Sequence, residues 1–151
     1  MKFITPFTIG LAALSLPDTV LAAFPTGCRF WTTSGKYLLA QCWRNNGNEL
    51  ATRQDMNLCL ANNNGELVPR NNGNAFNSCT WEIYHTDLGI VSYKCKKSNG
   101  SMGDEKAFDL RSVNIEVIDG YIWCFGHRSA PHAWSKREEL LLEDRSSPKD
   151  E

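Results

Sequence analysis

The amino-acid sequence predicts an all-β domain made of two related halves and held together by disulfides. Three observations support this prediction: five Asn-Gly or Asp-Gly pairs, strand-like runs between those pairs, and six cysteines in a repeating order. Asparagine, aspartate and glycine tolerate the positive φ angles that tight hairpin turns require. A chain with so many turns is expected to consist of many short strands.

The turn-forming pairs punctuate the whole chain. They are Asn46-Gly47, Asn64-Gly65, Asn72-Gly73, Asn99-Gly100 and Asp119-Gly120. Runs rich in aromatic and β-branched residues lie between them, at 36–43, 90–95 and 121–125, and favour strands. Helix signals are weak except near the C-terminus, where Ser135 caps a predicted helix over 136–145.

The N-terminus has the features of a secretory signal peptide. Lys2 supplies a positive charge, residues 7–16 are almost entirely apolar, and Val20-Leu21-Ala22 fits the pattern before a cleavage site. The apolar run is far shorter than the ~20 residues that a membrane-spanning helix needs. We therefore expect cleavage after Ala22, no membrane insertion, and a secreted, extracellular protein.

Composition argues against nucleic-acid binding and against a metal site built from the cysteines. The sixteen basic and seventeen acidic residues are interspersed, and the net charge is −1. Nucleic-acid binding needs a basic surface, so no nucleic-acid partner is expected. All six cysteines follow the predicted cleavage point. An even number of cysteines in an exported chain is typical of a disulfide framework and not of a metal site.

The cysteines and turns occur twice in the same order. Cys28 and Cys42 bracket one predicted strand pair, and Cys79 and Cys95 bracket another about fifty residues on. An Asn-Gly turn, an acidic-apolar step and a second Gly turn before a strand follow each pair. This order predicts an internal duplication, although small β-proteins also reuse such turns without being duplicated.

A specific motif lies between the two cysteine pairs. It reads DMNLCLANNNGELV over 55–68 and GNAFNSC over 73–79. Together with the thirteen residues between Cys28 and Cys42, it resembles the signature of the cyanovirin-N homology family, especially its fungal members. The resemblance covers about residues 24–125. It is weaker in the second repeat, where Asp109-Leu110-Arg111 replaces the Asp-Leu-Asn motif of the family.

The resemblance implies a pseudo-symmetric, all-β fold in which each half is built from parts of both repeats. Short helical turns are expected between the strands. We expect a signal peptide over 1–22, one domain over 23–126, and a charged C-terminal tail over 127–151. Within the domain, repeat one covers about 24–74 and repeat two about 75–126.

The resemblance also implies two disulfides, Cys28–Cys42 and Cys79–Cys95. Bridges that close loops of this size stabilise a fold by about 3 kcal/mol each. Cys59 and Cys124 are then left over. They form either a third bridge or two buried thiols.

The resemblance implies that mannose-type glycans bind near each end of the molecule. One carried-over site consists of Asn62, Asn64, Asn74 and Ser78. The other consists of Thr26, Gly27, Asn45 and Asp119. Neutral polar groups held rigidly at turns suit the hydroxyl groups of sugars. Asparagine is also common at turns for conformational reasons alone.

Three positions depart from the family pattern. Trp43 replaces an acidic residue, Ser98 replaces an arginine, and Val117 replaces an asparagine. These changes remove charge-assisted hydrogen bonds. The asparagine-rich site keeps more polar groups, so we favour it over the other.

The remaining motifs give little support for catalysis. His85, His127 and His132 lie in no recognisable motif, and solvated histidines are the better interpretation. Trp43, Trp81 and Trp123 lie in strand-like runs and are expected in the core. The sequon Asn99-Gly100-Ser101 predicts N-glycosylation of Asn99 on a turn.

These observations favour a secreted lectin-like protein that binds mannose-type or related glycans, or glycoproteins, without catalysis, metal or cofactor. Single-site affinity is expected to be modest, and the protein is expected to be a monomer or a dimer swapped through residues 69–74. The alternative is a secreted interaction protein, such as an effector, that keeps the fold and has lost sugar binding. Trp43 and Ser98 favour that alternative.

Overall fold

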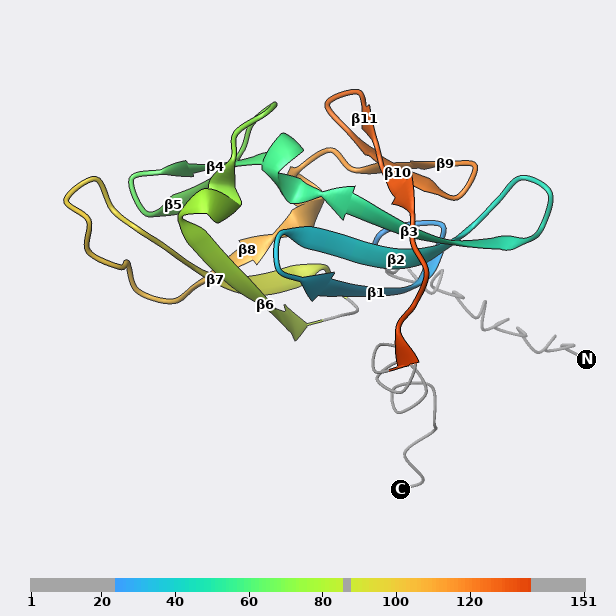
Figure 1. Cartoon of the computed structure of the whole chain (residues 1–151), viewed down its shortest axis with the longest axis horizontal. Helices are drawn as coiled ribbons and strands as arrows, with labels where there is room; N and C mark the ends of the chain where they lie inside the picture. The colour runs from blue at the N-terminus through green and yellow to red at the C-terminus, as the bar shows by residue number, and fades with distance from the viewer. Residues whose placement is uncertain (1–23, 86–87, 137–151) are drawn as a thin grey trace, which may run out of the picture.

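A computed structural model describes residues 24–85 and 88–136 of the chain (Figure 1). The predicted signal peptide over 1–22 lies outside the described residues, as does nearly all of the predicted helix over 136–145. The side chain of His85 also lies outside them. The expectations placed on these parts stay predictions.

Within the described residues the chain forms twelve short strands and three single-turn 3₁₀ helices, which confirms the all-β class. The strands are β1 (Cys28–Ser34), β2 (Tyr37–Trp43), β3 (Glu49–Asp55), β4 (Leu60–Asn63), β5 (Glu66–Pro69), β6 (Cys79–His85), β7 (Ile90–Cys95), β8 (Lys106–Asp109), β9 (Glu116–Ile118), β10 (Tyr121–Cys124), β11 (His127–Arg128) and β12 (Ala130–Pro131). The 3₁₀ helices are η1 (Met56–Leu58), η2 (Ala75–Asn77) and η3 (Leu110–Ser112). The three predicted strand-like runs correspond to β2, β7 and β10.

The strands form two pseudo-symmetric halves. Half A contains the sheet β1-β2-β3-β12 and the sheet β11-β10-β9, and half B contains the hairpin β4-β5 and the sheet β6-β7-β8. Half B lies on the left of Figure 1 and half A on the right. Repeat one supplies β1 to β5, and repeat two supplies β6 to β10. Each half therefore contains strands from both repeats, as the resemblance implies.

The two repeats share hydrogen bonds as well as strand order. The loop after β2 closes through a bond from Arg44 N to Asn48 O (2.8 Å), and the loop after β7 closes through a bond from Lys97 N to Ser101 O (2.8 Å). An aspartate immediately precedes each of the helices η1 and η3, and its carboxylate accepts a bond from the backbone N–H two residues on. These matched bonds confirm the internal duplication.

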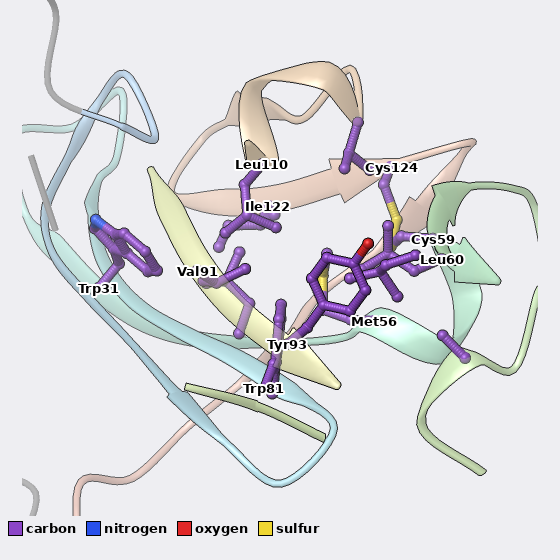
Figure 2. Packing of buried hydrophobic residues seen from close by; sticks show 14 of the residues in the cluster. Trp31, Met56, Cys59, Leu60, Trp81, Val91, Tyr93, Leu110, Ile122 and Cys124 are labelled. Carbon is purple, nitrogen blue, oxygen red and sulfur yellow. A yellow bond between two sulfur atoms is a disulfide. The ribbon is translucent and has the colours of Figure 1, made fainter. Parts of the chain in front are cut away.

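One apolar core runs through both halves (Figure 2). Its fully buried side chains come from β2, η1, β7, η3 and β10, and they include Leu38, Met56, Val91, Leu110 and Ile122. Burying such side chains contributes about 1.5–3 kcal/mol each relative to leaving them in water. Because the same core serves both halves, neither half has an apolar interior of its own.

The three tryptophans expected in the core differ in burial. Trp81 is buried, and its indole N–H donates to the Gly35 carbonyl oxygen (2.6 Å). Trp123 is half-buried. Trp43 is 50% exposed, so its expected place in the core is wrong. Trp43 follows the buried Cys42 in β2, and consecutive strand residues point to opposite faces of a sheet.

All six cysteines are paired. Cys28–Cys42 joins β1 to β2, and Cys79–Cys95 joins β6 to β7, as the resemblance implies. Cys59–Cys124 is a third bridge, between the residue after η1 and the end of β10 (Figure 2). The alternative of two buried thiols is therefore wrong. The first two bridges each close a hairpin, whereas the third joins positions 65 residues apart.

The residues after Gly126 continue the fold. β11 pairs with β10, and β12 pairs with β3. Ser129, between these two strands, is buried. Its hydroxyl accepts a hydrogen bond from Ile122 N (2.9 Å) and contacts the hydroxyl of Thr52. The hydrogen-bonded fold thus extends past the expected boundary at residue 126, because the first residues of the predicted tail complete half A.

Candidate functional site

Asn62 organises the polar residues that were predicted to bind sugar in half B. Its side-chain nitrogen donates to the Ser78 hydroxyl (2.8 Å) and to the Lys96 carbonyl oxygen (2.7 Å). Its side-chain oxygen accepts a bond from Gly65 N (2.7 Å). Both amide hydrogens of Asn62 are therefore used within the protein. Asn62 acts as a positioning residue that holds the β4–β5 turn against the residue before β6 and the residue after β7.

Asn64 lies at the tip of the same turn and is exposed. Its φ angle is +50°, and its side-chain oxygen accepts a bond from Ser98 N (2.8 Å). That bond uses only the oxygen, so the amide nitrogen keeps two hydrogens that can bind a ligand. The next residue, Gly65, lies so close to the loop after β7 that an added Cβ would be 3.0 Å from Lys97 Cγ. We call Asn62, Asn64, Ser78 and Ser98 the half-B cluster.

Glu66 attaches the other end of this turn to the sheet of half B. The Tyr93 hydroxyl donates to one carboxylate oxygen (3.0 Å), and the Lys106 ammonium group contacts the other. These bonds, chiefly the one from Lys106, hold the pKa of Glu66 below its usual range. Tyr93 belongs to β7 and Lys106 to β8, so the hairpin is fastened to two strands.

Asn74 is the fourth residue predicted for this site, and its hydrogen bonds go to residues outside the half-B cluster. It pairs with Ala61 in an isolated β-bridge, and its side-chain nitrogen donates to the Asn72 carbonyl oxygen at 3.4 Å. Its φ angle is +53°, which asparagine adopts more readily than most residues. None of its described hydrogen bonds reaches the half-B cluster. Its conformational role accounts for its residue type.

The residues predicted for the second site lie around the corresponding turn of half A. Asp119, at the tip of the β9–β10 turn, accepts a bond from Asn45 N (3.0 Å). Its carboxylate also pairs with the Arg44 guanidinium (3.3 Å). Gly27 follows the exposed Thr26 and precedes β1. We call Gly27, Asn45, Val117 and Asp119 the half-A cluster.

The two clusters are built on matching hydrogen bonds. In half B, Ser98 N donates to Asn64 Oδ1; in half A, Asn45 N donates to Asp119 Oδ1. Likewise, Lys96 N donates to Ser78 O (2.9 Å) in half B, and Trp43 N donates to Gly27 O (2.9 Å) in half A. Pseudo-symmetry therefore gives the two clusters matching backbone hydrogen bonds at equivalent positions of the two repeats.

The side chains of the two clusters make half B polar and half A apolar at the same place. Val117 in half A takes the place of Asn62 in half B, and Gly27 takes the place of Ser78. A Cβ added to Gly27 would lie 3.6 Å from Val117 Cγ1, which is ordinary van der Waals contact. The hydrogen bond between Asn62 and Ser78 has thus no counterpart in half A.

Charge is the second difference, and it predicts different responses to acid. The Asn45 backbone N–H and then the Arg44 guanidinium lower the pKa of Asp119 below its ordinary 3.8. These bonds are therefore present above the ordinary value and are lost as pH falls through the lowered pKa. In an NMR titration from neutral pH to below 3.8, we expect the Asn45 amide resonance to move much further than the Ser98 amide resonance, because the acceptor of Ser98 N–H, Asn64, does not titrate, and Glu66 of the same turn is bonded to Tyr93 and Lys106 instead. A movement of the Ser98 resonance as large as that of Asn45 would contradict this assignment.

The other candidates for chemistry do not gather into a site. His127 Nε2 lies 2.8 Å from Asn71 Oδ1, and His132 packs edge-on against Trp134, with ring centroids 5.2 Å apart. Among the described residues, no three His, Cys, Asp or Glu side chains form a group that could hold a metal ion. In the same part of the chain, no helix has the length and apolar character needed to cross a membrane.

The structure places three further groups in contact with the clusters or their turns, and the sequence did not point to them as parts of a site. They are the carbonyl of Lys96, the side-chain stem of Lys97 and the guanidinium of Arg44. Each lies one or two residues after Cys95 or Cys42. The second cysteine of each pair was the signal that could have found them.

Solved structures of several proteins share this fold. A MoCVNH3 variant (Mo0v) in complex with (N-GlcNAc)4 matches with a TM-score of 0.57 and 14% identity, over 65% of this chain and 93% of that one. A microvirin:mannobiose complex matches with a TM-score of 0.53 and 18% identity, over 65% and 94%. TbCVNH from T. borchii matches with a TM-score of 0.51 and 21% identity, over 64% and 92%. At these identities the likeness shows the fold alone.

Sequence comparison covers the same part of the chain. A comparison with curated proteins found no match. The family model of the CVNH domain matches residues 24–123, which include both clusters and the hairpins closed by the two short disulfides. The match covers β1 to β9 and all but the last residue of β10. The chain therefore belongs to the CVNH domain family.

Proposed function

We propose that this protein is a secreted lectin that binds mannose-type or related glycans at the half-B cluster. Membership of the CVNH family supports sugar as the ligand class, as do the related folds solved with mannobiose and with (N-GlcNAc)4. The predicted signal peptide and the three disulfides support secretion, because such bridges persist in oxidising compartments. Glycoproteins that carry these glycans are the proposed partners.

The choice of half B depends on one observation: Asn62 holds a turn whose exposed tip residue, Asn64, is neutral, whereas the tip residue of half A, Asp119, is charged. Sugar hydroxyls are neutral donors and acceptors, so they are matched best by amide and hydroxyl groups that are already fixed in place. The amide group of Asn64 is such a group, because its oxygen is held by Ser98 N–H, and the neutral hydroxyl of Ser98 lies beside it; both residues are exposed. The hydrogen bonds of Asn62 already hold the turn in the free protein, so a ligand binds without the entropic cost of ordering it.

The half-A cluster offers less to a neutral sugar. The Asp119 carboxylate is already paired with the Arg44 guanidinium and with the Asn45 N–H. Val117 and Gly27 contribute no side-chain donor or acceptor. One working site of a few neutral hydrogen bonds gives modest affinity, so avidity needs a second copy of the chain. A dimer swapped through residues 69–74 stays a prediction.

Asn64→Gly tests the proposed site. Glycine accepts the φ angle of +50° at this position, so the substitution removes the side chain without straining the turn. We expect the affinity for a mannose-type glycan to fall about tenfold, which corresponds to about 1.4 kcal/mol. Isothermal titration calorimetry measures the affinity, and circular dichroism checks that the fold is kept.

Asp119→Gly is the matched control, because Asp119 has the same φ angle and the same turn position in half A. We expect little change in glycan affinity for this variant. A larger loss for Asp119→Gly than for Asn64→Gly would contradict the choice of half B. The absence of any glycan binding by the unchanged protein, produced without a glycan on Asn99, would contradict the lectin function.

A secreted interaction protein is the second candidate, and exposed apolar side chains favour it. Trp43 and Ile118 are 50% and 51% exposed. Both flank the half-A cluster, since Trp43 N donates to Gly27 O and Ile118 precedes Asp119. Exposed aromatic side chains are enriched at protein interfaces. A folded protein without a glycan on Asn99 that binds nothing on a glycan array would favour this candidate over the lectin.

A further inference from the structure

The loop between β7 and β8 places the sequon Asn99-Gly100-Ser101 beside the half-B cluster. The loop is a tight turn, in which Gly100 N donates to Lys97 O (2.9 Å) and Lys97 N donates to Ser101 O (2.8 Å). Ser98, a member of the half-B cluster, immediately precedes Asn99. A group attached to Asn99 therefore begins one residue away from the proposed sugar site.

The side chain of Asn99 is arranged to accept a glycan. Its oxygen accepts hydrogen bonds from the Ser101 backbone N–H (3.0 Å) and from the Ser101 hydroxyl (2.7 Å). These bonds leave the side-chain nitrogen, which is the atom that carries the sugar, available. Asn99, Gly100 and Ser101 are all exposed, and a Cβ added to Gly100 meets nothing within 4 Å. The surroundings of the turn have room for an attached oligosaccharide.

Half A contains the same turn without the sequon. In the sequence Asn46-Gly47-Asn48, Asn48 N donates to Asn46 Oδ1 (3.0 Å), and Gly47 N donates to Arg44 O (3.0 Å). Asn48 lacks the hydroxyl group that an acceptor sequence requires at its third position. The pseudo-symmetry therefore supplies a control loop of the same geometry within one molecule.

We propose that Asn99 is N-glycosylated during secretion and that the attached glycan masks the half-B cluster. The co-reactant is an oligosaccharide carried on a lipid pyrophosphate. A bond forms between Asn99 Nδ2 and the anomeric carbon of the first sugar. The bond from that carbon to the pyrophosphate oxygen breaks, the lipid pyrophosphate leaves, and the amide loses one proton. The masking rests on the proposed lectin function, whereas the modification does not.

Masking follows from the position and the chemical class of the attached group. The glycan starts next to Ser98, whose N–H is bonded to Asn64, the proposed ligand contact. It is also a carbohydrate, the class of ligand proposed for the site. A short tether gives an attached group an effective concentration on the order of 1 mM. A site of modest affinity is therefore covered or occupied by its own glycan before a free glycan reaches it.

The modification is tested by secreting the full chain from a eukaryotic host and measuring the mass of the product. Ser101→Asn is the matched variant, because it creates the Asn-Gly-Asn sequence that half A already folds into this turn. We expect the unchanged protein to carry an oligosaccharide on Asn99 and the variant to carry none. A secreted, unchanged protein without a glycan on Asn99 would overturn the proposal.

Binding to an immobilised mannose-type glycan tests the masking. We expect the glycosylated protein to bind about tenfold more weakly than Ser101→Asn, and enzymatic removal of the glycan to restore binding. Equal binding before and after removal would overturn the masking. If neither Ser101→Asn nor the deglycosylated protein binds any glycan, both the masking and the lectin function are overturned, whereas the mass spectrum still decides the modification.

The sequon can also be moved from one half to the other. Combining Ser101→Asn with Asn48→Ser places the acceptor sequence in the loop of half A, at Asn46. We expect this double variant to be glycosylated and to bind as strongly as Ser101→Asn alone, because the half-B cluster is uncovered. Binding as weak as that of the glycosylated, unchanged protein would mean that position is irrelevant, and would overturn the masking.

Discussion

Replacing Cys59 and Cys124 together with alanine is expected to lower the free energy of unfolding by about 4 kcal/mol. The bridge joins positions 65 residues apart, so its removal frees a long loop in the unfolded chain. It also connects repeat one to repeat two inside the shared core (Figure 2). Urea denaturation followed by tryptophan fluorescence measures the loss, provided that the slope of the transition is compared as well.

The double replacement of Cys28 and Cys42 is the matched control, since it removes the same atoms from a hairpin. These residues are 14 apart, so the expected loss is about 3 kcal/mol. A smaller loss for the 65-residue bridge than for the 14-residue bridge would contradict the loop-length argument. That result would mean that the core alone holds the ends of η1 and β10 together.

Asn62→Ala is expected to lower the free energy of unfolding by about 2 kcal/mol and to bring glycan binding to the limit of detection. The substitution removes three hydrogen bonds, to Ser78, Lys96 and Gly65. The N–H of Gly65, a buried residue, is then left without its partner, which is costly. The turn that carries Asn64 is no longer held against β7. Thermal denaturation and calorimetric titration measure the two effects.

Asn63→Ala is the matched control. It removes an asparagine next to Asn62 and so tests whether the loss of stability and binding is specific to Asn62. Asn63 is exposed and neighbours Asn62 in β4, so we expect little change in stability or binding. NMR spectra of Asn62→Ala should show moved amide resonances for Gly65 and Ser98, with the half-A resonances unchanged. Normal glycan binding by folded Asn62→Ala, measured well below its unfolding temperature, would contradict the positioning role.

The hairpins could be predicted because their signals are local. An Asn-Gly or Asp-Gly pair favours a turn through the backbone preferences of two adjacent residues, and four of the five pairs connect strands that are neighbours in a sheet. The predicted strand over 90–95 coincides with β7. Asn72-Gly73 is the exception and connects β5 to η2, since β5 already has its partner in β4. The duplication could be predicted for the same reason, because the two cysteines of each hairpin lie close together in the sequence.

The interior of the proposed site could not be predicted in the same way. Asn62 donates to the carbonyl of Lys96, 34 residues away, and a carbonyl is present on every residue, so it leaves no trace in the sequence. β11 and β12 have two residues each, which is too short for any periodicity. Alternation in β2 could not give the exposure of Trp43 either, because Leu38, Leu39 and Ala40 are all buried, so both faces of that strand carry core residues.

The exchange of strands between the halves has a consequence for how the two sites were inherited. No site is encoded by a single repeat: Asn64 of half B comes from repeat one and Ser98 from repeat two, while in half A the order is reversed. Drift in one copy of the duplicated gene segment therefore changes one side of both sites. The second repeat carries Val117 into half A and Ser98 into half B. Keeping one repeat unchanged would therefore not have preserved either site. Each site had to be kept or lost one substitution at a time.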